Sequence, residues 1–128
     1  MPASSREEIR AFLQEVKAVV SQTPSLTRFW RLVDRRENLD FMATVGLTRA
    51  DIGEAILGLS VEDYCEGPMQ DHTEPGDVWV FGKAISGKET YIKLKLAVVS
   101  IVKIVRVISF HEANQPLRYP FKQAGKAG

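Results

Sequence analysis

Residues 90–96, Thr-Tyr-Ile-Lys-Leu-Lys-Leu, alternate polar and apolar side chains without a break, and no other part of the chain constrains the fold as strongly. In a β-strand, successive side chains point to opposite faces. One face of this strand then carries Tyr91, Lys93 and Lys95, and the other face is apolar. The sequence therefore predicts a half-buried strand whose open face presents a phenol and two ammonium groups.

Helical signals occupy the N-terminal half of the chain. Ser5 and Thr48 each begin a capping-box pattern, in which a hydroxyl binds free backbone amides and a carboxylate follows three residues later. Apolar residues then recur at helical spacing, and Gly46 and Gly58 are typical helix stops. These patterns predict helices over about residues 6–21, 35–45 and 48–58.

Strand signals dominate the C-terminal half, where residues 77–85, 88–97 and 102–110 predict a three-stranded antiparallel meander. A short edge strand is expected within residues 26–33. Residues 66–76 contain Gly67-Pro68, Pro75 and Gly76 and are expected to form a loop. Residues 115–121 are expected to form an extended tail over the surface.

This order of elements predicts one α+β domain over residues 1–121, with N-terminal helices packed on a small antiparallel sheet. The C-terminal meander completes the sheet. Residues 122–128 are expected to be a disordered tail.

A two-residue turn at Ser86-Gly87 sets the expected pairing of the first two meander strands. Gly82 then lies opposite Tyr91, which leaves room beside the phenol because glycine has no side chain. Lys83 lies on the core-facing side, opposite Thr90. It would leave that side only by snorkelling or through a bulge.

The second turn of the meander is expected between Ala97 and Val102, and it brings the last strand alongside Tyr91. Ser109 is then expected near Tyr91, and His111 near Glu89 at the rim of the same face. A slip of one residue would move His111 to the other side of the sheet.

Composition and charge narrow the classes of protein. A single cysteine, Cys65, excludes an internal disulfide and fits the reducing cytoplasm. No apolar run is long enough to span a bilayer, and residues 1–15 lack a signal-peptide core. Residues 1–81 carry 8 Lys+Arg and 14 Asp+Glu, whereas residues 82–128 carry 9 and 2. The basic half indicates a phosphate-binding surface, unless the two halves complement each other within the fold.

Metal and cofactor motifs are lacking in the sequence. His72 and His111 are far apart, and no HxxxH or CxxC spacing occurs. Residues 71–74, Asp-His-Thr-Glu, have the composition of an ordinary solvated loop. Gly-rich phosphate loops and serine-nucleophile motifs are also absent. We therefore expect neither a metal nor an organic cofactor.

Tyr91 and His111 form a candidate acid–base pair, because histidine exchanges protons near neutral pH and tyrosine can donate one. Lys93 and Lys95 are candidates for neutralising a phosphate, and Arg118 extends the positive surface. The alternative is structural: a tyrosine at a strand rim, a histidine in a loop, and lysines that keep the strand soluble and unpaired.

An ordered set of short motifs runs through the chain. The motifs are Asn38-Leu39, Val45-Gly46-Leu47-Thr48, Gly58-Leu59-Ser60 with Asp63-Tyr64, Val78-Trp79, Tyr91-Ile92-Lys93 and Ile108-Ser109-Phe110. With these motifs in this order, the chain resembles the MqsR family of type II toxins over roughly residues 38–112. The resemblance implies a compact ribonuclease of RelE-like fold.

The same resemblance implies metal-independent cleavage of messenger RNA, by attack of a ribose 2′-hydroxyl on the adjacent phosphate, and an antitoxin protein as partner. Tyr91 matches the functional Tyr of the family, and His111 stands where the better-known pattern has Lys. Glu66 falls where that pattern has another functional Lys, and Val80 where it has Gln. Lys83 is the candidate that would supply the missing charge.

Two functions remain open. The first is a cytoplasmic RNA endonuclease toxin with no membrane attachment. Its expected catalytic residues are Tyr91, His111 and Lys83, and its expected RNA-binding residues are Lys93, Lys95 and Arg118. The second is a divergent relative that binds RNA or a protein partner without cutting.

Overall fold

The computed structural model describes residues 4–22, 29–71 and 76–122. The helices are α1 (Arg6–Gln22), α2 (Arg36–Val45) and α3 (Arg49–Leu57), followed by a short 3-10 turn, η1 (Val61–Asp63). The strands are β1 (Trp30–Leu32), β2 (Tyr64–Gln70), β3 (Asp77–Ile85), β4 (Lys88–Val99) and β5 (Val102–Glu112). They form one five-stranded sheet in the order β1-β5-β4-β3-β2. The expected α+β fold is confirmed.

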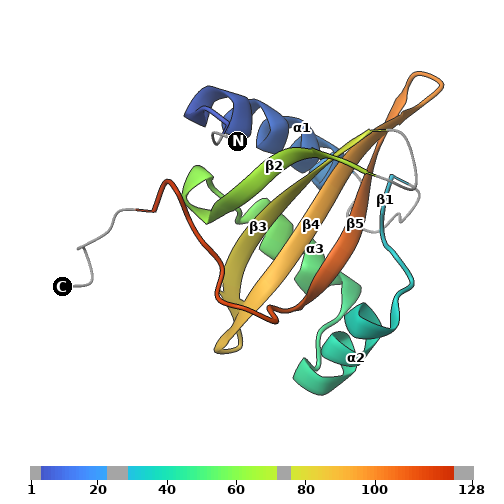
Figure 1. The fold of residues 1–128 in the computed structure, drawn as a ribbon. Helices are drawn as coiled ribbons and strands as arrows, with labels where there is room; N and C mark the ends of the chain where they lie inside the picture. Colours follow the sequence, from blue (N-terminus) through green and yellow to red (C-terminus); the bar gives the residue numbers. More distant parts are fainter. Residues whose placement is uncertain (1–3, 23–28, 72–75, 123–128) are drawn as a thin grey trace.

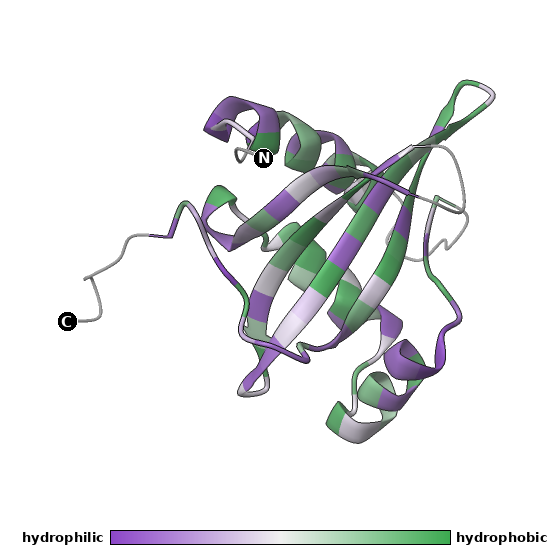
Figure 2. Ribbon diagram, viewed as in Figure 1, coloured by the Kyte–Doolittle hydropathy of each residue, from purple (hydrophilic) through white to green (hydrophobic). Residues whose placement is uncertain are grey.

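The helices and the sheet form two layers. Figure 1 shows α1 and α3 behind the sheet, and α2 beside β5. Helix α1 buries its apolar stripe against the sheet; its buried residues are Ile9, Phe12, Leu13, Val16, Val19 and Val20. Phe12 stacks on Trp79 of β3 with ring centroids 4.5 Å apart. Hydrophilic and hydrophobic residues alternate along β4 (Figure 2), as the pattern of residues 90–96 predicts. Helices α1 and α3 cover one face of the sheet, and a functional site is therefore sought on the opposite face.

The sheet has more strands than expected. Residues 64–70 form β2, antiparallel to β3 at the edge of the sheet, so the prediction of a loop from residue 66 was wrong for its first part. Gly67-Pro68 suggested a loop, but the pair lies within the strand, at a register shift between Glu66 and Met69. Proline is tolerated there because an edge strand has amides that need no ladder partner. At the other edge, β1 pairs in parallel with β5 and confirms the expected edge strand.

Several expectations fall outside the described residues. They are the start of the predicted edge strand at residues 26–28, the loop residues 72–75 with His72, and the end of the predicted tail at residues 123–128.

The β3–β4 hairpin follows the predicted register at every pair. Gly82 lies opposite Tyr91, and Lys83 opposite Thr90. Ser86 and Gly87 both have positive φ angles, 52° and 78°, as a tight hairpin turn of this length requires. Because a two-residue turn leaves no freedom in pairing, this register was predictable from the sequence.

The β4–β5 register differs from the expected one. Tyr91 pairs with His111 itself, and Lys93 pairs with Ser109. The prediction that these side chains share a face is confirmed, but the predicted neighbours were two residues off. The difference arises from the position of the turn and from a bulge in β5.

The bulge in β5 decides which way its last residues point. One extra residue, Ile108, lies between two pairs that are adjacent on β4. An extra residue turns every later side chain to the opposite face. Uninterrupted pairing would set His111 opposite Thr90, which is fully buried on the helix side. The bulge instead turns His111 toward Tyr91.

The side chain of Asn38, from α2, holds this bulge. It is fully buried, and its Nδ2 donates hydrogen bonds to the carbonyl oxygens of Val33 (3.0 Å) and Ile108 (3.1 Å). Its Oδ1 accepts a hydrogen bond from the backbone amide of Phe110 at 2.9 Å. A bulge leaves backbone groups without ladder partners, and a buried amide side chain can satisfy both donors and acceptors. Asn38 of α2 thus supports the bulge that determines on which face of the sheet the His111 side chain lies.

Candidate functional site

A cavity of about 700 Å³ lies on the face of the sheet that turns away from α1 and α3. Its floor comes from β3, β4 and β5, and includes Tyr91, Lys93 and His111. Residues 113–121, which follow β5 and are called the strap below, form one wall and cross the front of the sheet in Figure 1. We name this hollow the Tyr91 cavity. It brings together the two residues predicted as an acid–base pair.

Tyr91 and His111 stack across the β4–β5 ladder, with ring centroids 5.6 Å apart and an interplanar angle of 24°. Burial raises the pKa of Tyr91, and the negative charge of Glu66 raises it further. The phenol therefore keeps its proton at neutral pH and can donate it.

His111 is poised to accept a proton at one ring nitrogen. Its Nδ1 lies 3.0 Å from the carbonyl oxygen of Glu112. A carbonyl only accepts hydrogen bonds, so this contact requires the proton on Nδ1 and leaves Nε2 as the basic nitrogen. A phenol and an imidazole that line one cavity side by side can serve as acid and base for one reacting group.

Cationic side chains surround this pair. Lys93 lies beside it, with its Nζ 6.0 Å from the centre of the Tyr91 ring. Arg118 reaches the cavity from the strap, and Arg35 from the residue that precedes α2. Arg35 was not predicted as a site residue, because its only signal in the sequence is a basic pair, Arg35-Arg36, at a helix start. Its charge acts on Tyr91, where it lowers the pKa against the larger opposing effects of burial and Glu66.

Two of the predicted site residues lie elsewhere. Lys83 is on the helix side of the sheet, where its Nζ lies 3.9 Å from the carboxylate of Asp63. Lys95 was expected on the open face, but it is only 2% exposed and forms an ion pair with Asp71 at 2.8 Å. The expected exposure of Lys95 was therefore wrong, and its RNA-binding role stays a prediction that its burial does not favour. The alternating sequence predicts on which face of the sheet Lys95 lies, but it does not predict the ion pair with Asp71.

Glu66 lines the Tyr91 cavity close enough to act on Tyr91. Its carboxylate therefore lines the same cavity as Tyr91 and His111, where the resemblance implied a Lys. A carboxylate here favours the protonated phenol and opposes an anion.

Replacing Glu66 with Gln is expected to lower the pKa of Tyr91, because a negative charge near the phenol is removed while burial stays. An NMR titration with tyrosine labelled at the ring carbon next to the hydroxyl measures this directly. Tyr119 is the internal control, since its raised pKa comes from burial and from Glu89. An unchanged or higher pKa of Tyr91 would contradict the placement of Glu66.

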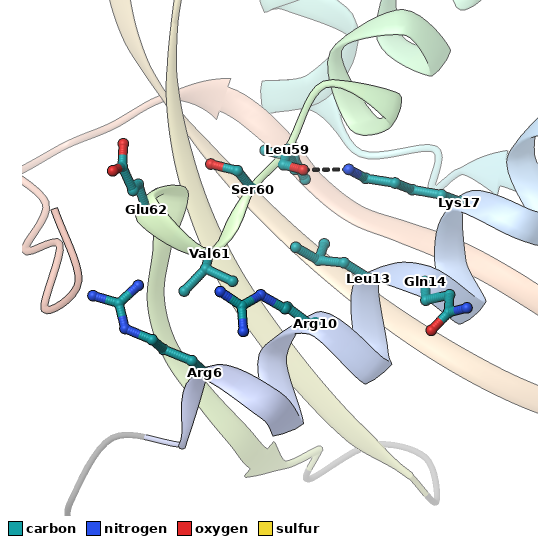
Figure 3. A pocket seen from close by; sticks show the side chains of 9 residues that line it. All are labelled: Arg6, Arg10, Leu13, Gln14, Lys17, Leu59, Ser60, Val61 and Glu62. Atoms are coloured by element: carbon teal, nitrogen blue, oxygen red, sulfur yellow. Dashed lines mark hydrogen bonds between the residues drawn. The ribbon is translucent and has the colours of Figure 1, made fainter.

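A second hollow, of about 570 Å³, lies between α1 and η1 (Figure 3). Arg6 and Arg10 lie along one edge of α1, and the ammonium of Lys17 donates a hydrogen bond to the carbonyl of Leu59. The described residues that line it include no histidine or tyrosine. The Tyr91 cavity is therefore the better candidate for chemistry.

Within residues 4–22, 29–71 and 76–122, no three His, Cys, Asp or Glu side chains are grouped as a metal site would require. In the same part of the chain, no helix has the length and apolar character needed to cross a bilayer.

The profile of the family described as "Motility quorum-sensing regulator, toxin of MqsA" matches residues 10–112. This span runs from α1 to the last residue of β5, and so contains Tyr91 and His111 but not the strap. No curated protein and no solved structure matches the chain.

Proposed function

Because this chain belongs to the MqsR family of toxins, and is thus the toxin of a toxin–antitoxin pair, we propose that it is an endoribonuclease that cuts messenger RNA in the Tyr91 cavity. The observation that carries the proposal is the stacked pair of Tyr91 and His111 on a cationic floor. RNA brings its own nucleophile, the ribose 2′-hydroxyl, so the protein needs only a base, an acid and positive charge.

In the proposed reaction, Nε2 of His111 takes the proton of the 2′-hydroxyl. The 2′-oxygen bonds to the adjacent phosphorus, and the bond from phosphorus to the 5′-oxygen of the next nucleotide breaks. Tyr91 gives its proton to that leaving oxygen. The products are a 2′,3′-cyclic phosphate and a 5′-hydroxyl. The raised pKa of Tyr91 supports this assignment, since only the neutral phenol is an acid.

Positive charge must meet the charge that develops on the phosphate oxygens. Lys93 lies beside Tyr91, and Arg35 lines the same cavity from the other side of β5. An arginine can bind two phosphate oxygens with parallel hydrogen bonds. We therefore assign the phosphate to Lys93 and Arg35, with Arg118 at the rim, and leave out Lys83 and Lys95.

Replacing Arg35 with Ala is expected to weaken RNA binding on the order of tenfold, or about 1.4 kcal/mol, because a phosphate contact is lost. The salt dependence should fall with it, by a slope of about 0.7 for one contact to a single strand. Both are measured by fluorescence anisotropy in a His111→Ala background, so that no RNA is cut. Arg36→Ala is the matched control, because Arg36 is exposed and does not line the cavity. Equal losses in both variants would remove Arg35 from the site.

Cleavage itself is tested with purified protein and end-labelled single-stranded RNA in EDTA. We expect fragments that end in a cyclic phosphate and begin with a 5′-hydroxyl, which polynucleotide kinase can label. The Tyr91→Phe, His111→Ala double variant, prepared in parallel, controls for contaminating nucleases.

Binding without cleavage is the second candidate function, and the carboxylate of Glu66 in the cavity favours it. If the wild-type protein binds RNA in the same assay but cuts none, this second function replaces the first.

A further inference from the structure

The strap is held against the sheet at its start, its middle and its end. Its first amide, at Ala113, donates a hydrogen bond to the carbonyl of Glu89 at 2.8 Å and so extends the β4–β5 pairing. Figure 1 shows the strap leaving β5, crossing the front of the sheet and ending beyond β2. Near its end, the ring of Phe121 lies 5.9 Å from that of Tyr64. The guanidinium of Arg6 covers its ring at 4.9 Å.

Glu89 of β4 holds the middle of the strap. One of its carboxylate oxygens accepts a hydrogen bond from the backbone amide of Leu117 at 3.2 Å, and the other accepts one from the hydroxyl of Tyr119 at 2.8 Å. Pro116 and Pro120 restrict the backbone on either side and so reduce the entropy lost on ordering. The path of the strap is therefore specified by side chains and backbone together.

Gly82 provides the surface on which the strap rests. A Cβ atom at this position would lie 2.6 Å from Cδ1 of Leu117 and 2.8 Å from Cε1 of Tyr119. The sequence predicted open space beside Tyr91 because Gly82 lacks a side chain. This prediction was wrong, since the strap fills the space and closes one side of the Tyr91 cavity.

The strap presents both polar and apolar groups to the Tyr91 cavity. Asn114 and Gln115 line it together with Pro116 and Leu117. Both amide side chains are exposed, and neither forms a hydrogen bond with any residue in the described part of the chain. An amide offers a donor and an acceptor in one plane, which matches the edge of a nucleobase. A phosphate would bind more strongly to the cations on the cavity floor than to these neutral amides.

We propose that the strap forms a nucleobase-binding subsite next to the scissile phosphate. Asn114 and Gln115 hydrogen-bond the edge of the base, and Pro116 and Leu117 pack against its face. This inference rests on RNA as the ligand of the Tyr91 cavity. Unpaired bases can present their edges in this way, so the subsite selects single-stranded RNA and prefers one base at one position.

The subsite is tested by cutting a randomised RNA pool and sequencing the new ends. The wild-type protein should show a preference at one position beside the cut. The Asn114→Ala, Gln115→Ala double variant should reduce that preference by about tenfold, since one good bidentate contact is worth about 1–3 kcal/mol of discrimination. A variant that cuts with unchanged preference would overturn the subsite.

Gly82→Ala tests the strap without replacing any residue of the subsite. The new methyl group displaces Leu117 and Tyr119, so the same preference should be lost. Gly58→Ala is the matched control, because its Cβ would meet no atom closer than 3.5 Å. Retained preference in Gly82→Ala, with a folded protein by circular dichroism, would contradict the role of the strap.

A parallel selection scores binding rather than cleavage and separates the two proposals. RNA retained by the His111→Ala protein from the same pool is sequenced for base preference. If the wild-type protein cuts nothing but this preference exists and depends on Asn114 and Gln115, the subsite stands and the nuclease falls. If RNA is cut or bound with no base preference, the subsite falls alone, and if no RNA is bound, both fall.

Discussion

Replacing His111 with Ala is expected to lower the rate of RNA cleavage by about 10²–10⁴-fold, the usual contribution of a positioned general base. Tyr91→Phe should cost a similar factor, because the ring and its stacking remain while the donated proton is lost. In the proposed reaction both residues act on the same phosphate, and their stacked rings, with centroids 5.6 Å apart, place them next to each other. Single-turnover cleavage of a short labelled RNA measures the chemical step in both variants.

Glu112→Ala is the matched control for this pair of variants. Glu112 is the next residue on β5, but its side chain is exposed and lies 3.9 Å from Lys88 on the other face of the sheet. The carbonyl that binds His111 stays in place. A loss in Glu112→Ala equal to that in His111→Ala would show that the strand, and not the imidazole, is responsible.

Replacing Asn38 with Ala is expected to destabilise the fold by about 3–5 kcal/mol, because two carbonyls and one amide lose their partners and each buried loss costs about 1–3 kcal/mol. Asn38→Asp should not rescue stability. It keeps the acceptor for the Phe110 amide but loses the donor to the carbonyls of Val33 and Ile108. Chemical denaturation measures the free energy of unfolding.

The same variant tests whether Asn38 sets the facing of His111. NOEs between the rings of Tyr91 and His111 should weaken in folded Asn38→Ala, because the bulge loses its support. Leu39→Ala is the control on the same helix; Leu39 is 48% exposed, and its loss should cost less than about 1 kcal/mol. A stable Asn38→Ala protein with intact ring NOEs would contradict this account of the bulge.

Local patterns predicted the parts of the fold that depend on near neighbours. Alternation in residues 90–96 revealed the open face of β4, and the Ser86-Gly87 turn determined the β3–β4 register. The β4–β5 register was missed because the bulge at Ile108 is supported by Asn38, which is 70 residues away in the chain. The sequence of β5 alone does not show that a distant asparagine will support a bulge in it.

The candidate site was predictable to the same extent. Tyr91, Lys93 and His111 follow from strand parity once the two hairpins are recognised. Arg35 lies before a helix, and its position near β5 depends on the tertiary fold, which local patterns do not predict. The burial of Lys95 likewise depends on Asp71, a residue from the loop end of β2. Periodicity shows which face a side chain takes but not what comes to lie over that face.

In the proposed reaction the RNA supplies its own nucleophile, and one substituted RNA tests this directly. Once the cut is mapped, the nucleotide on its 5′ side is replaced by its 2′-deoxy counterpart in an otherwise identical strand. Cleavage at this bond is expected to stop, while binding of the substituted strand to the His111→Ala protein is expected to persist. Continued cleavage of the 2′-deoxy strand at the same bond would contradict the proposed reaction, because the attacking oxygen would then have to come from elsewhere.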